Sequence, residues 1–499
     1  ERPITIAFYA DWADESAPSL AKHLDQVDWV APTLLALDPA GQLIEMQDAR
    51  LRHLVQTAAR RPLVVPVVQN AIEGKFDGRA TAALLADASR RQALVRSLVA
   101  YLDRTGDAGI VFDFEDLPAS SLGNLHRLLE ETRAAFAPRQ RIVSLTVPLG
   151  DPAWKPREFA DVTDRIVLMA YDQHWAGGTP GPIAANDWFA RQLAPMLKGL
   201  EPGKAVVALG SYGYDWHDHT ADSLTIEEAW LAARDSDEKP VYDPVSGNTG
   251  FSFDEDGHRH DVWMLDAAAS WNQMRILTRL GVANVALWRL GSEDPGFWSA
   301  LSAWRTGGRP DLSRIDQVGN VDVEGQGEIL DITATPSPGR RAVRFDATRD
   351  DVVAENYVTL PTPYVVERSG ARPREVALSF DDGPDPHWTP RILSILEKYH
   401  VPGSFFIVGE NGLTQGALLR RMVADGDEIG NHSYTHPNMA EESDRGIGLE
   451  INATTRLIEA ETGRSTRLFR APYFGDAEPT TTDELKPALI ARQLGYTVA

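Results

Sequence analysis

The chain has 499 residues, of which 43% are hydrophobic and 24% charged, a balance typical of a globular protein with large buried cores. At ~100–200 residues per domain, this length predicts two or three domains. Acidic residues outnumber Lys and Arg by 72 to 49, and the net charge of −23 would repel a phosphate backbone, so we expect no nucleic-acid partner. Cys is absent, which excludes disulfides, thiolate nucleophiles and Cys-ligated zinc. Any metal must therefore bind through His, Asp or Glu.

Two kinds of targeting segment are relevant here: a membrane-spanning helix and an N-terminal leader. The longest apolar runs, such as residues 63–68 and 166–170, are far shorter than the ~20 residues needed to cross a bilayer, so we expect no membrane-spanning helix. The sequence starts at Glu1 without Met and without a basic-then-apolar leader. Either a signal or anchor has been removed or the sequence begins inside a longer protein, and both alternatives stay open.

Residues 1–308 alternate short β-branched runs with longer amphipathic runs, the βαβα pattern of a parallel sheet covered by helices. The stretch after the seventh strand is too long for one helix, so we predict an inserted lobe at about residues 210–265, with a hairpin over 249–264 that turns at Asp256-Gly257. Eight such units predict an α/β fold of the (β/α)8 TIM barrel type. The expected barrel strands are residues 5–9, 29–33, 63–68, 109–115, 142–147, 165–170, 205–209 and 284–288.

The second half of the chain predicts a different organisation. Residues 309–372 contain short, alternating runs and are rich in Gly, Pro and charged residues. They are interpreted as a strand-containing connector. Residues 373–499 form a second βα series that ends just as another strand begins, so we expect a C-terminally incomplete domain whose last strand has an open edge. The expected strands are 376–380, 404–408, 428–431, 468–470 and 496–498, and the expected helices are 389–400, 413–425, 447–462 and 483–494.

The first candidate site lies in the segment GIVFDFE at residues 109–115. Side chains alternate along a strand, so Val111, Asp113 and Glu115 share one face. The segment ends at the carboxyl side of the fourth barrel strand, where barrel active sites lie. Two carboxylates this close should raise one pKa, which would keep Glu115 protonated as a general acid while Asp113 stays charged. The alternative is a solvated acidic strand end.

The same segment resembles the active-site strand of glycoside hydrolase family 18, the chitinase-like barrels, and especially the branch with cell-wall N-acetylglucosaminidases. Three further segments fall where that family expects them: LMAYDQHW at 168–175, GSYGYDW at 210–216 and VALWR at 285–289. Together the four segments span the whole barrel.

The resemblance implies substrate-assisted catalysis, in which the sugar's own N-acetyl oxygen attacks the anomeric carbon, with no cofactor in the barrel. It implies that Glu115 protonates the leaving oxygen, that Asp113 orients the acetamido group, and that Tyr171 hydrogen-bonds the forming oxazoline, braced by Asp172. Trp288 would form the sugar-stacking floor. The remaining predicted substrate-binding residues are Tyr212 and Trp175.

Two observations qualify these roles. For Tyr171 and Trp288 the alternative is core packing. The fuller family pattern carries Asp where this sequence has Ala108 and Val111. Asp113 then has no carboxylate at position 111 with which to share a proton, so we do not expect the rate and pH profile of true chitinases.

The second candidate site combines SFDDGP at residues 379–384 with HSYTH at 432–436. The Gly-Pro turn lets the adjacent carboxylates Asp381 and Asp382 reach one cavity. His432 and His436 are spaced i and i+4, which makes them neighbours if the segment forms a helical turn. With Asp382 they supply three N and O ligands and leave a position for water, as in a catalytic zinc site. The alternatives are a structural metal or none.

With RAPY at residues 470–473, these segments resemble the first three motifs of the NodB-type polysaccharide deacetylases, carbohydrate esterase family 4. The resemblance implies a divalent metal, zinc in our prediction, with Asp381 as general base, Arg470 holding Asp381, and Tyr473 in the oxyanion pocket. The implied metal ligands are Asp382, His432 and His436. Two further family motifs would follow Ala499, one with a general-acid His, so we expect little deacetylase activity from the chain as given.

The two resemblances predict a protein of the bacterial-type cell envelope, outside the cytoplasm, that acts on polymers of β-linked N-acetylglucosamine. Both chemistries use the same acetamido group. The open alternatives are peptidoglycan as the substrate, or a pair of degenerate domains that bind glycan without turnover. Proteins of this arrangement often continue into a membrane-attached glycosyltransferase, so the resemblance implies such a portion outside this chain.

Overall fold

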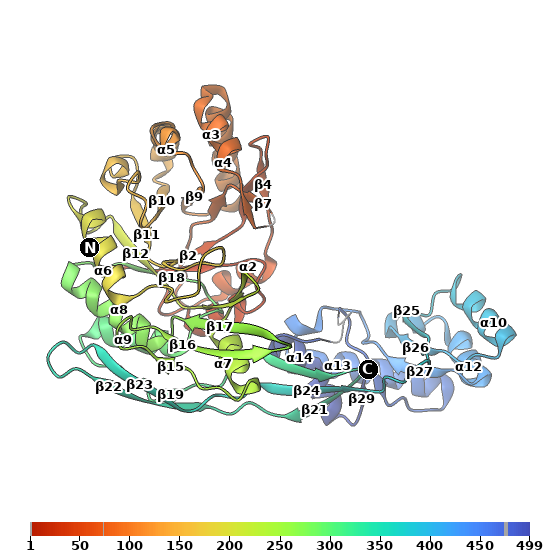
Figure 1. Ribbon diagram of the computed structural model, residues 1–499. Helices are drawn as coiled ribbons and strands as arrows, with labels where there is room; N and C mark the ends of the chain where they lie inside the picture. Colours follow the sequence, from red (N-terminus) through yellow and green to blue (C-terminus); the bar gives the residue numbers. More distant parts are fainter. Residues whose placement is uncertain (1, 73, 474–477) are drawn as a thin grey trace. The chain divides into compact units, whose positions relative to one another are not determined.

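The computed structural model describes residues 2–72, 74–473 and 478–499, which divide into two compact units (Figure 1). The barrel unit consists of Glu1–Asp316 and Pro338–Pro361, and the C-terminal unit of Gln317–Ser337 and Thr362–Ala499. Within the described residues no helix is both long enough and apolar enough to cross a membrane.

The barrel unit contains a closed ring of parallel strands, which confirms the predicted (β/α)8 barrel. The third strand is interrupted into two halves: β5 pairs with β2, while β6 pairs with β9. The ring closes because β18 pairs with both β12 and β1. Its strands are β1 (Thr5–Tyr9), β2 (Trp29–Pro32), β5 (Leu63–Val64), β6 (Val67–Gln69), β9 (Gly109–Asp113), β10 (Ile142–Pro148), β11 (Arg165–Met169), β12 (Ala205–Gly210) and β18 (Val285–Trp288).

Strand β9 shows how the pleat separates the two layers of this barrel. Val111 is fully buried in the barrel interior, among the β-branched and small side chains of the neighbouring strands. Ile110 and Phe112 point the other way and pack in the larger core beneath the outer helices. Position 111 is thus part of a buried hydrophobic interior, and the predicted alternation of faces along residues 109–115 is confirmed.

Helices cover the outside of the ring, and their ends follow from the sequence. The longest of them, α4, begins after Asp87, whose carboxylate accepts from the backbone N–H groups of Ser89 and Arg90, and it ends at Gly106 in the left-handed conformation (φ 77°). The outer helices are α1 (Ser16–His23), α2 (Ala49–Thr57), α3 (Gly78–Ala86), α4 (Ala88–Thr105), α5 (Leu122–Phe136), α6 (Asn186–Leu197), α8 (Ala267–Leu280) and α9 (Gly296–Thr306).

Shorter elements complete the barrel loops. β3 pairs in parallel with β6 and carries the antiparallel β4, while β7 and β8 form a small antiparallel pair. Three 3₁₀ turns join longer elements: Ala119–Ser121, Ala137–Arg139 and Pro156–Phe159. The short strands are β3 (Leu35–Leu37), β4 (Leu43–Glu45), β7 (Ala71–Ile72) and β8 (Lys75–Phe76).

The stretch between β12 and β18 forms a lobe with its own antiparallel sheet. Its central hairpin joins β16 to β17 through Asp256 (φ 50°) and Gly257 (φ 85°), so the predicted Asp-Gly turn is confirmed. The lobe elements are β13 (Gly213–His217), β14 (Thr220–Leu224), α7 (Ile226–Asp235), β15 (Val241–Tyr242), β16 (Thr249–Glu255) and β17 (His258–Met264).

Residues 309–372, predicted as a connector, contribute six strands to two different sheets. β19 (Arg314–Ile315), β22 (Gly339–Phe345) and β23 (Val352–Thr359) continue the lobe sheet of the barrel unit. β20 (Val321–Gly325), β21 (Ile329–Ala334) and β24 (Tyr364–Ser369) belong to the C-terminal unit. These pairings join residues distant in sequence, which local composition does not reveal.

A buried ion-pair network holds β22 and β23 in the barrel unit. The side chain of Arg341 is fully buried; its guanidinium binds Asp294 and lies 3.4 Å from Oε1 of Glu355. Tyr357 donates to Asp266, the residue that caps α8. Breaking a buried pair by removing one partner leaves an uncompensated charge, so this contact fixes segment 338–361 to the barrel.

The C-terminal unit is built on an open sheet ordered β20-β24-β21-β29-β28-β27-β26-β25. The predicted βα series is present, although the first strand begins at Ser379 rather than at residue 376. Its strands from β25 on are β25 (Ser379–Gly383), β26 (Ser404–Ile407), β27 (Glu428–Asn431), β28 (Leu468–Phe469) and β29 (Thr497–Val498). Its helices are α10 (Thr389–Tyr399), α11 (Gly409–Gly412), α12 (Gly416–Asp425), the 3₁₀ turn Met439–Glu441, α13 (Asp444–Thr462) and α14 (Thr482–Gln493).

The predicted open edge on the last strand is wrong. β29 pairs in parallel with β28 on one side and antiparallel with β21 on the other, where Leu330 lies opposite Val498. Both side chains are buried in the core of this unit. This partner was not predicted because residues 309–372 were interpreted as a connector, and a contact across this sequence distance leaves no local signal.

Candidate active sites

The barrel site begins with Asp113, the last residue of β9, which is only 4% exposed. Its Oδ1 accepts a hydrogen bond from the Thr146 hydroxyl on β10 (2.6 Å), and its Oδ2 accepts from the Gln69 amide on β6 (2.8 Å). Because β6 and β10 flank β9 in the ring, both donors come from adjacent strands. The orientation of the Asp113 carboxylate is therefore fixed from two sides.

Glu115 follows two residues later, at the carboxyl end of the same strand. Its backbone is bound on both sides by the buried Asn70 side chain: Asn70 Nδ2 donates to the Glu115 carbonyl, and the Glu115 N–H donates to Asn70 Oδ1, both at 2.9 Å. Burial, followed by the charges of Asp113 and Asp172, raises the pKa of Glu115 to about 8. Glu115 therefore holds its proton at neutral pH, as a general acid must.

The expected contrast between the two carboxyl groups is only partly present. Burial also raises the pKa of Asp113, and the hydrogen bonds from Thr146 and Gln69 act in the opposite direction. Position 111, where the family pattern has Asp, is the buried Val111 and offers Asp113 no carboxylate. Both hydrogen bonds are accepted by Asp113 oxygens, so they favour its ionised form over the protonated one.

Tyr171 and Asp172 follow the end of β11, with Asp172 in the left-handed region (φ 61°). Asp172 Oδ1 accepts from the hydroxyls of Tyr212 and, at 3.1 Å, Tyr214. Burial raises the pKa of the Tyr171 hydroxyl, which therefore stays protonated and able to donate. Asp172 thus binds the two lobe tyrosines, of which the sequence analysis had singled out only Tyr212.

Three of the predicted aromatic residues lie together at the mouth of the barrel. The Tyr171 ring stacks on Trp288, with centroids 6.4 Å apart and an interplanar angle of 24°, and meets Tyr212 edge to face at 6.0 Å. Trp288 also contacts Phe8 of the barrel interior. Tyr171 and Trp288 are only partly buried, and they pack against both the barrel interior and the core of the lobe. Each ring can therefore pack in the core and still contact a sugar.

Trp175 lies further along the loop after β11, and its residue surface is 56% exposed. Its carbonyl accepts from the indole N–H of Trp216 in the lobe (3.3 Å). The ring covers Gly177 so closely that a Cβ there would lie 2.4 Å from its atoms. The loop therefore needs a residue without a side chain beneath an exposed indole ring, and that ring is available to stack on a ligand.

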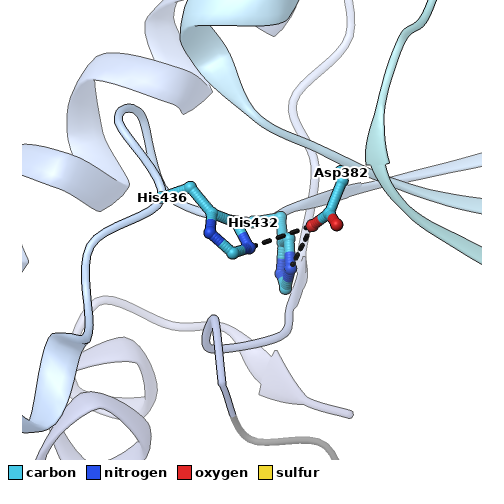
Figure 2. A group of neighbouring side chains, drawn as sticks. All are labelled: Asp382, His432 and His436. Atoms are coloured by element: carbon cyan, nitrogen blue, oxygen red, sulfur yellow. Dashed lines mark ion pairs between the residues drawn. The ribbon is translucent and has the colours of Figure 1, made fainter.

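The second site lies in the C-terminal unit and brings Asp382, His432 and His436 together (Figure 2). Asp382 Oδ1 is 3.3 Å from Nε2 of His432 and 2.9 Å from Nε2 of His436. The three ligand atoms all lie within 4.8 Å of one another, and two imidazoles with one carboxylate suit a divalent metal ion. These residues therefore form a group able to hold a metal.

The two histidines are joined by a loop and not by a helical turn. Residues 432–436 form a loop after β27, so the condition of a helical turn is not met. Ser433 (φ 65°) and His436 (φ 58°) both adopt the left-handed conformation, which reverses the chain between the ligands. The i and i+4 spacing still brings the rings together, with centroids 5.1 Å apart.

Arg470 contacts both a predicted metal ligand and the predicted general base of this site. Its carbonyl accepts from Nδ1 of His432 (2.8 Å), which fixes the tautomer and leaves Nε2 free to face Asp382. Its guanidinium Nη1 donates to both oxygens of Asp381 at 3.1 and 3.3 Å. The expected contact between Arg470 and Asp381 is thus present.

Tyr473 lies beside the metal group and is 72% exposed. Its ring centroid is 5.0 Å from that of His436, in an edge-to-face contact. Asn411 donates to the backbone carbonyl of Asp382 at 2.8 Å and holds the end of β25. The predicted residues of this site are therefore all neighbours in one region of the unit.

Several residues of both sites were missed by the sequence analysis. A survey of the polar residues at the carboxyl ends of all barrel strands would have found Gln69, because barrel sites are built from those ends. For the supporting residues on other elements the sequence offers no such signal. The missed residues are Gln69, Asn70, Thr146, Tyr214, Asn411 and Glu450.

Comparison with known families identifies both units. The family model for glycosyl hydrolases family 18 matches residues 5–294, more than half of the chain, and the chain therefore belongs to that family. The family model for polysaccharide deacetylase matches residues 368–499. Both resemblances drawn from the motifs are confirmed.

Individual relatives repeat this division. An uncharacterized glycosylase, YvbX, of Bacillus subtilis (strain 168) is 23% identical over 300 residues, covering 57% of this chain and 86% of the relative. A chitooligosaccharide deacetylase of Sinorhizobium fredii is 41% identical over 111 residues, 22% of this chain and 51% of the relative. A peptidoglycan-N-acetylglucosamine deacetylase of Bacillus cereus is 38% identical over 99 residues, 20% of this chain and 36% of the relative. The chain thus spans about half or less of the length of these two deacetylases.

Solved structures agree with the fold of the barrel unit. The Bacillus cereus spore cortex-lytic enzyme SleL has a TM-score of 0.55 and 21% identity, covering 60% of this chain and 74% of that one. A chitinase from Chromobacterium violaceum has a TM-score of 0.56 and 20% identity, covering 61% of this chain and 99% of that one. At these identities the likeness concerns the fold.

Proposed function

We propose that this protein processes polymers of β-linked N-acetylglucosamine in the cell envelope, cleaving glycosidic bonds in the barrel and removing acetyl groups in the C-terminal unit, where we expect low activity. The observation that carries the proposal is the carboxyl pair at the end of β9: Glu115, with a pKa raised to about 8, beside an Asp113 held by two donors. A protonated acid next to an oriented carboxylate is what substrate-assisted cleavage requires.

In the first half of the reaction Glu115 donates its proton to the glycosidic oxygen as that bond breaks. The carbonyl oxygen of the sugar's own acetamido group attacks the anomeric carbon and forms an oxazolinium ion. Asp113 orients the acetamido N–H and stabilises the positive charge, and the neutral Tyr171 hydroxyl donates to the acetamido group. In the second half Glu115 takes a proton from the water that opens the ring, so the configuration at the anomeric carbon is retained.

The aromatic side chains would bind the sugar rings. Trp288 offers a partly exposed ring at the end of β18, and Trp175 offers an exposed one above Gly177. Apolar ring faces pack well on pyranose faces, since both expose C–H groups. Tyr212 contributes through Asp172, which it binds, and so supports the position of the residue next to Tyr171.

In the C-terminal unit Asp382, His432 and His436 would hold a divalent metal, which we propose is zinc. A metal of this kind supplies Lewis-acid activation of water and of the acetyl carbonyl. Asp381 accepts the proton of the attacking water, and Arg470 holds the Asp381 carboxylate in place. Tyr473, beside His436, borders the pocket for the oxyanion.

Peptidoglycan is a second candidate substrate, favoured by the relative named as a peptidoglycan-N-acetylglucosamine deacetylase. Binding without turnover is a third candidate, favoured by the apolar Val111 where the family pattern has Asp. Either substrate lies in the cell envelope, so the proposal places the protein outside the cytoplasm. Neither family match covers a glycosyltransferase, and the membrane-attached portion expected from the domain arrangement stays a prediction.

A single incubation separates these functions. Soluble N-acetylglucosamine oligomers and peptidoglycan fragments are incubated with the protein and Zn²⁺, and the products are analysed by mass spectrometry. Shortened chains establish the hydrolase, losses of acetyl establish the deacetylase, and intact oligomers that nevertheless bind establish the binding protein. Proton NMR of the first product must show the retained anomer; initial release of the inverted anomer contradicts substrate assistance.

A further inference from the structure

The loop that carries the two metal-site histidines is held by backbone hydrogen bonds to Ile407, Gly409 and Glu410 and, at its middle, by one carboxylate. All five backbone N–H groups of residues 432–436 have hydrogen-bond acceptors. Two of them, those of Tyr434 and Thr435, donate to the same oxygen, Oε2 of Glu450, at 2.7 Å each. The Thr435 hydroxyl donates to the other oxygen, Oε1, at 2.9 Å. One side chain therefore accepts three hydrogen bonds from the middle of the loop.

This loop needs such a contact because its conformation is unfavourable by itself. Ser433 and His436 are non-glycine residues in the left-handed region, a state that persists only where surrounding structure holds it. Thr435, next to His436, is exposed, so packing does not fix that residue. A charged acceptor is well suited to the task, since hydrogen bonds to a carboxylate are shorter and stronger than neutral ones.

Glu450 is itself placed on a rigid element. It lies on α13, whose neighbouring residues Ile447 and Ile451 are fully buried in the core of the C-terminal unit. The same helix holds the start of the loop, because Asn431 Nδ2 donates to the Ile451 carbonyl at 2.7 Å. Contacts to α13 therefore hold both the start and the middle of the segment that carries the two histidines.

We propose that Glu450 is a positioning residue that sets the metal affinity of the Asp382, His432 and His436 group. The inference rests on the metal site put forward as part of the proposed function. Without the Glu450 carboxylate the two imidazoles lose their fixed separation, and part of the binding free energy is then spent on ordering the loop. Contacts of this kind, one layer behind the ligands, typically change metal affinity ~10–100-fold.

The test measures Zn²⁺ affinity by competition with a chromophoric chelator, using the full chain. The variants are Glu450→Ala, Glu450→Gln and the matched control Glu459→Gln, whose carboxylate binds Arg456 on the same helix. We expect about one Zn²⁺ per wild-type chain and ~10–100-fold weaker binding by Glu450→Ala. Glu450→Gln should fall between them because its amide keeps one acceptor oxygen, and Glu459→Gln should match the wild type.

A spectroscopic readout separates positioning from a general loss of stability. The d–d absorption of Co²⁺ at saturation should differ in shape between the wild type and Glu450→Ala, because the ligand geometry differs, whereas lower stability alone leaves it unchanged. Equal affinity and equal spectra in both proteins overturn the inference and leave the metal site standing. If Glu450→Ala does not fold, Glu450→Gln decides: wild-type affinity and spectrum in that variant overturn the inference. A wild-type chain that binds neither metal overturns the site and the inference together.

Discussion

The two candidate sites differ in how far their charged groups are removed from water. In the barrel, Asp113 is 4% exposed and receives its hydrogen bonds from the strands on either side. In the C-terminal unit, the side chain of Asp382 is 68% exposed and that of Asp381 is 36% exposed. Desolvation can therefore shift the pKa of a proton donor in the barrel site. In the exposed C-terminal site, the electrostatic environment of the reacting groups must come from the charge of a bound metal and from Arg470.

The sites also differ in what positions their side chains. The barrel residues Asp113, Glu115 and Trp288 lie at the ends of strands whose neighbours are fixed by the closed ring, so their positions follow from the strands themselves. The C-terminal histidines lie on a loop with left-handed residues, and a helix beside the sheet holds that loop. Substitutions should therefore act separately on the two sites, and each of the following experiments tests that separation.

The largest effect is expected for Glu115→Gln, which removes the proton donor and leaves the volume almost unchanged. Glycan cleavage should fall ~10²–10⁴-fold, while metal content stays at the wild-type level. The rate of release of short oligomers measures the first quantity and elemental analysis the second. Glu130→Gln, an exposed position on α5, is the matched control. Cleavage by Glu115→Gln at the parent rate would remove Glu115 from its assigned role.

His432→Ala should produce the converse result. Loss of one of three ligands should reduce bound metal from about one ion per chain to background, while the barrel continues to cleave glycan at its normal rate. Elemental analysis after gel filtration measures the metal. His387→Ala, at an exposed histidine of the same unit, serves as the control. Equal metal content in wild type and His432→Ala would show that His432 is not a ligand.

The pH profile of cleavage tests the desolvated environment of Glu115. Its pKa is raised to about 8, first by burial and then by nearby negative charges, so the protonated, active form persists below that pH. We expect kcat/KM to fall about tenfold per pH unit above pH ~8. Asp172→Asn removes one of the charges that raise this pKa and should move the midpoint of the fall to lower pH. A midpoint that stays in place would contradict the electrostatic coupling between Asp172 and Glu115.

The smallest effect is expected for Trp175→Ala. Loss of an exposed stacking ring should weaken binding of long oligomers by ~0.5–1.5 kcal/mol, about 2–10-fold in KM, with kcat nearly unchanged. Trp388→Ala removes a similarly exposed indole, 59% against 56%, from the C-terminal unit. Equal changes in the KM for long oligomers in both variants would contradict a substrate-binding role for Trp175.

The motifs and the strand pattern were sufficient to predict the chemistry and most elements of both units. Side chains alternate between the two faces of any strand, so residues 109–115 were sufficient to predict that Val111, Asp113 and Glu115 share one face. The hairpin at Asp256 and Gly257 was predictable because few residue pairs adopt its turn. The open edge of β29 was predicted wrongly, since the pairing of that strand depends on β21, far away in the chain.

The sequence by itself determined which residues can do chemistry and on which face of a strand they lie, because side-chain identity and the two-residue strand period are local properties. Only the tertiary structure decided what surrounds them: Gln69 and Thr146 on Asp113, Asn70 on Glu115, and Glu450 on the histidine loop. Hydrogen-bond partners and burial depend on groups far apart in sequence, and burial is what raises the pKa of Glu115. The pKa of the acid and the separation of the metal ligands are therefore properties of the folded chain.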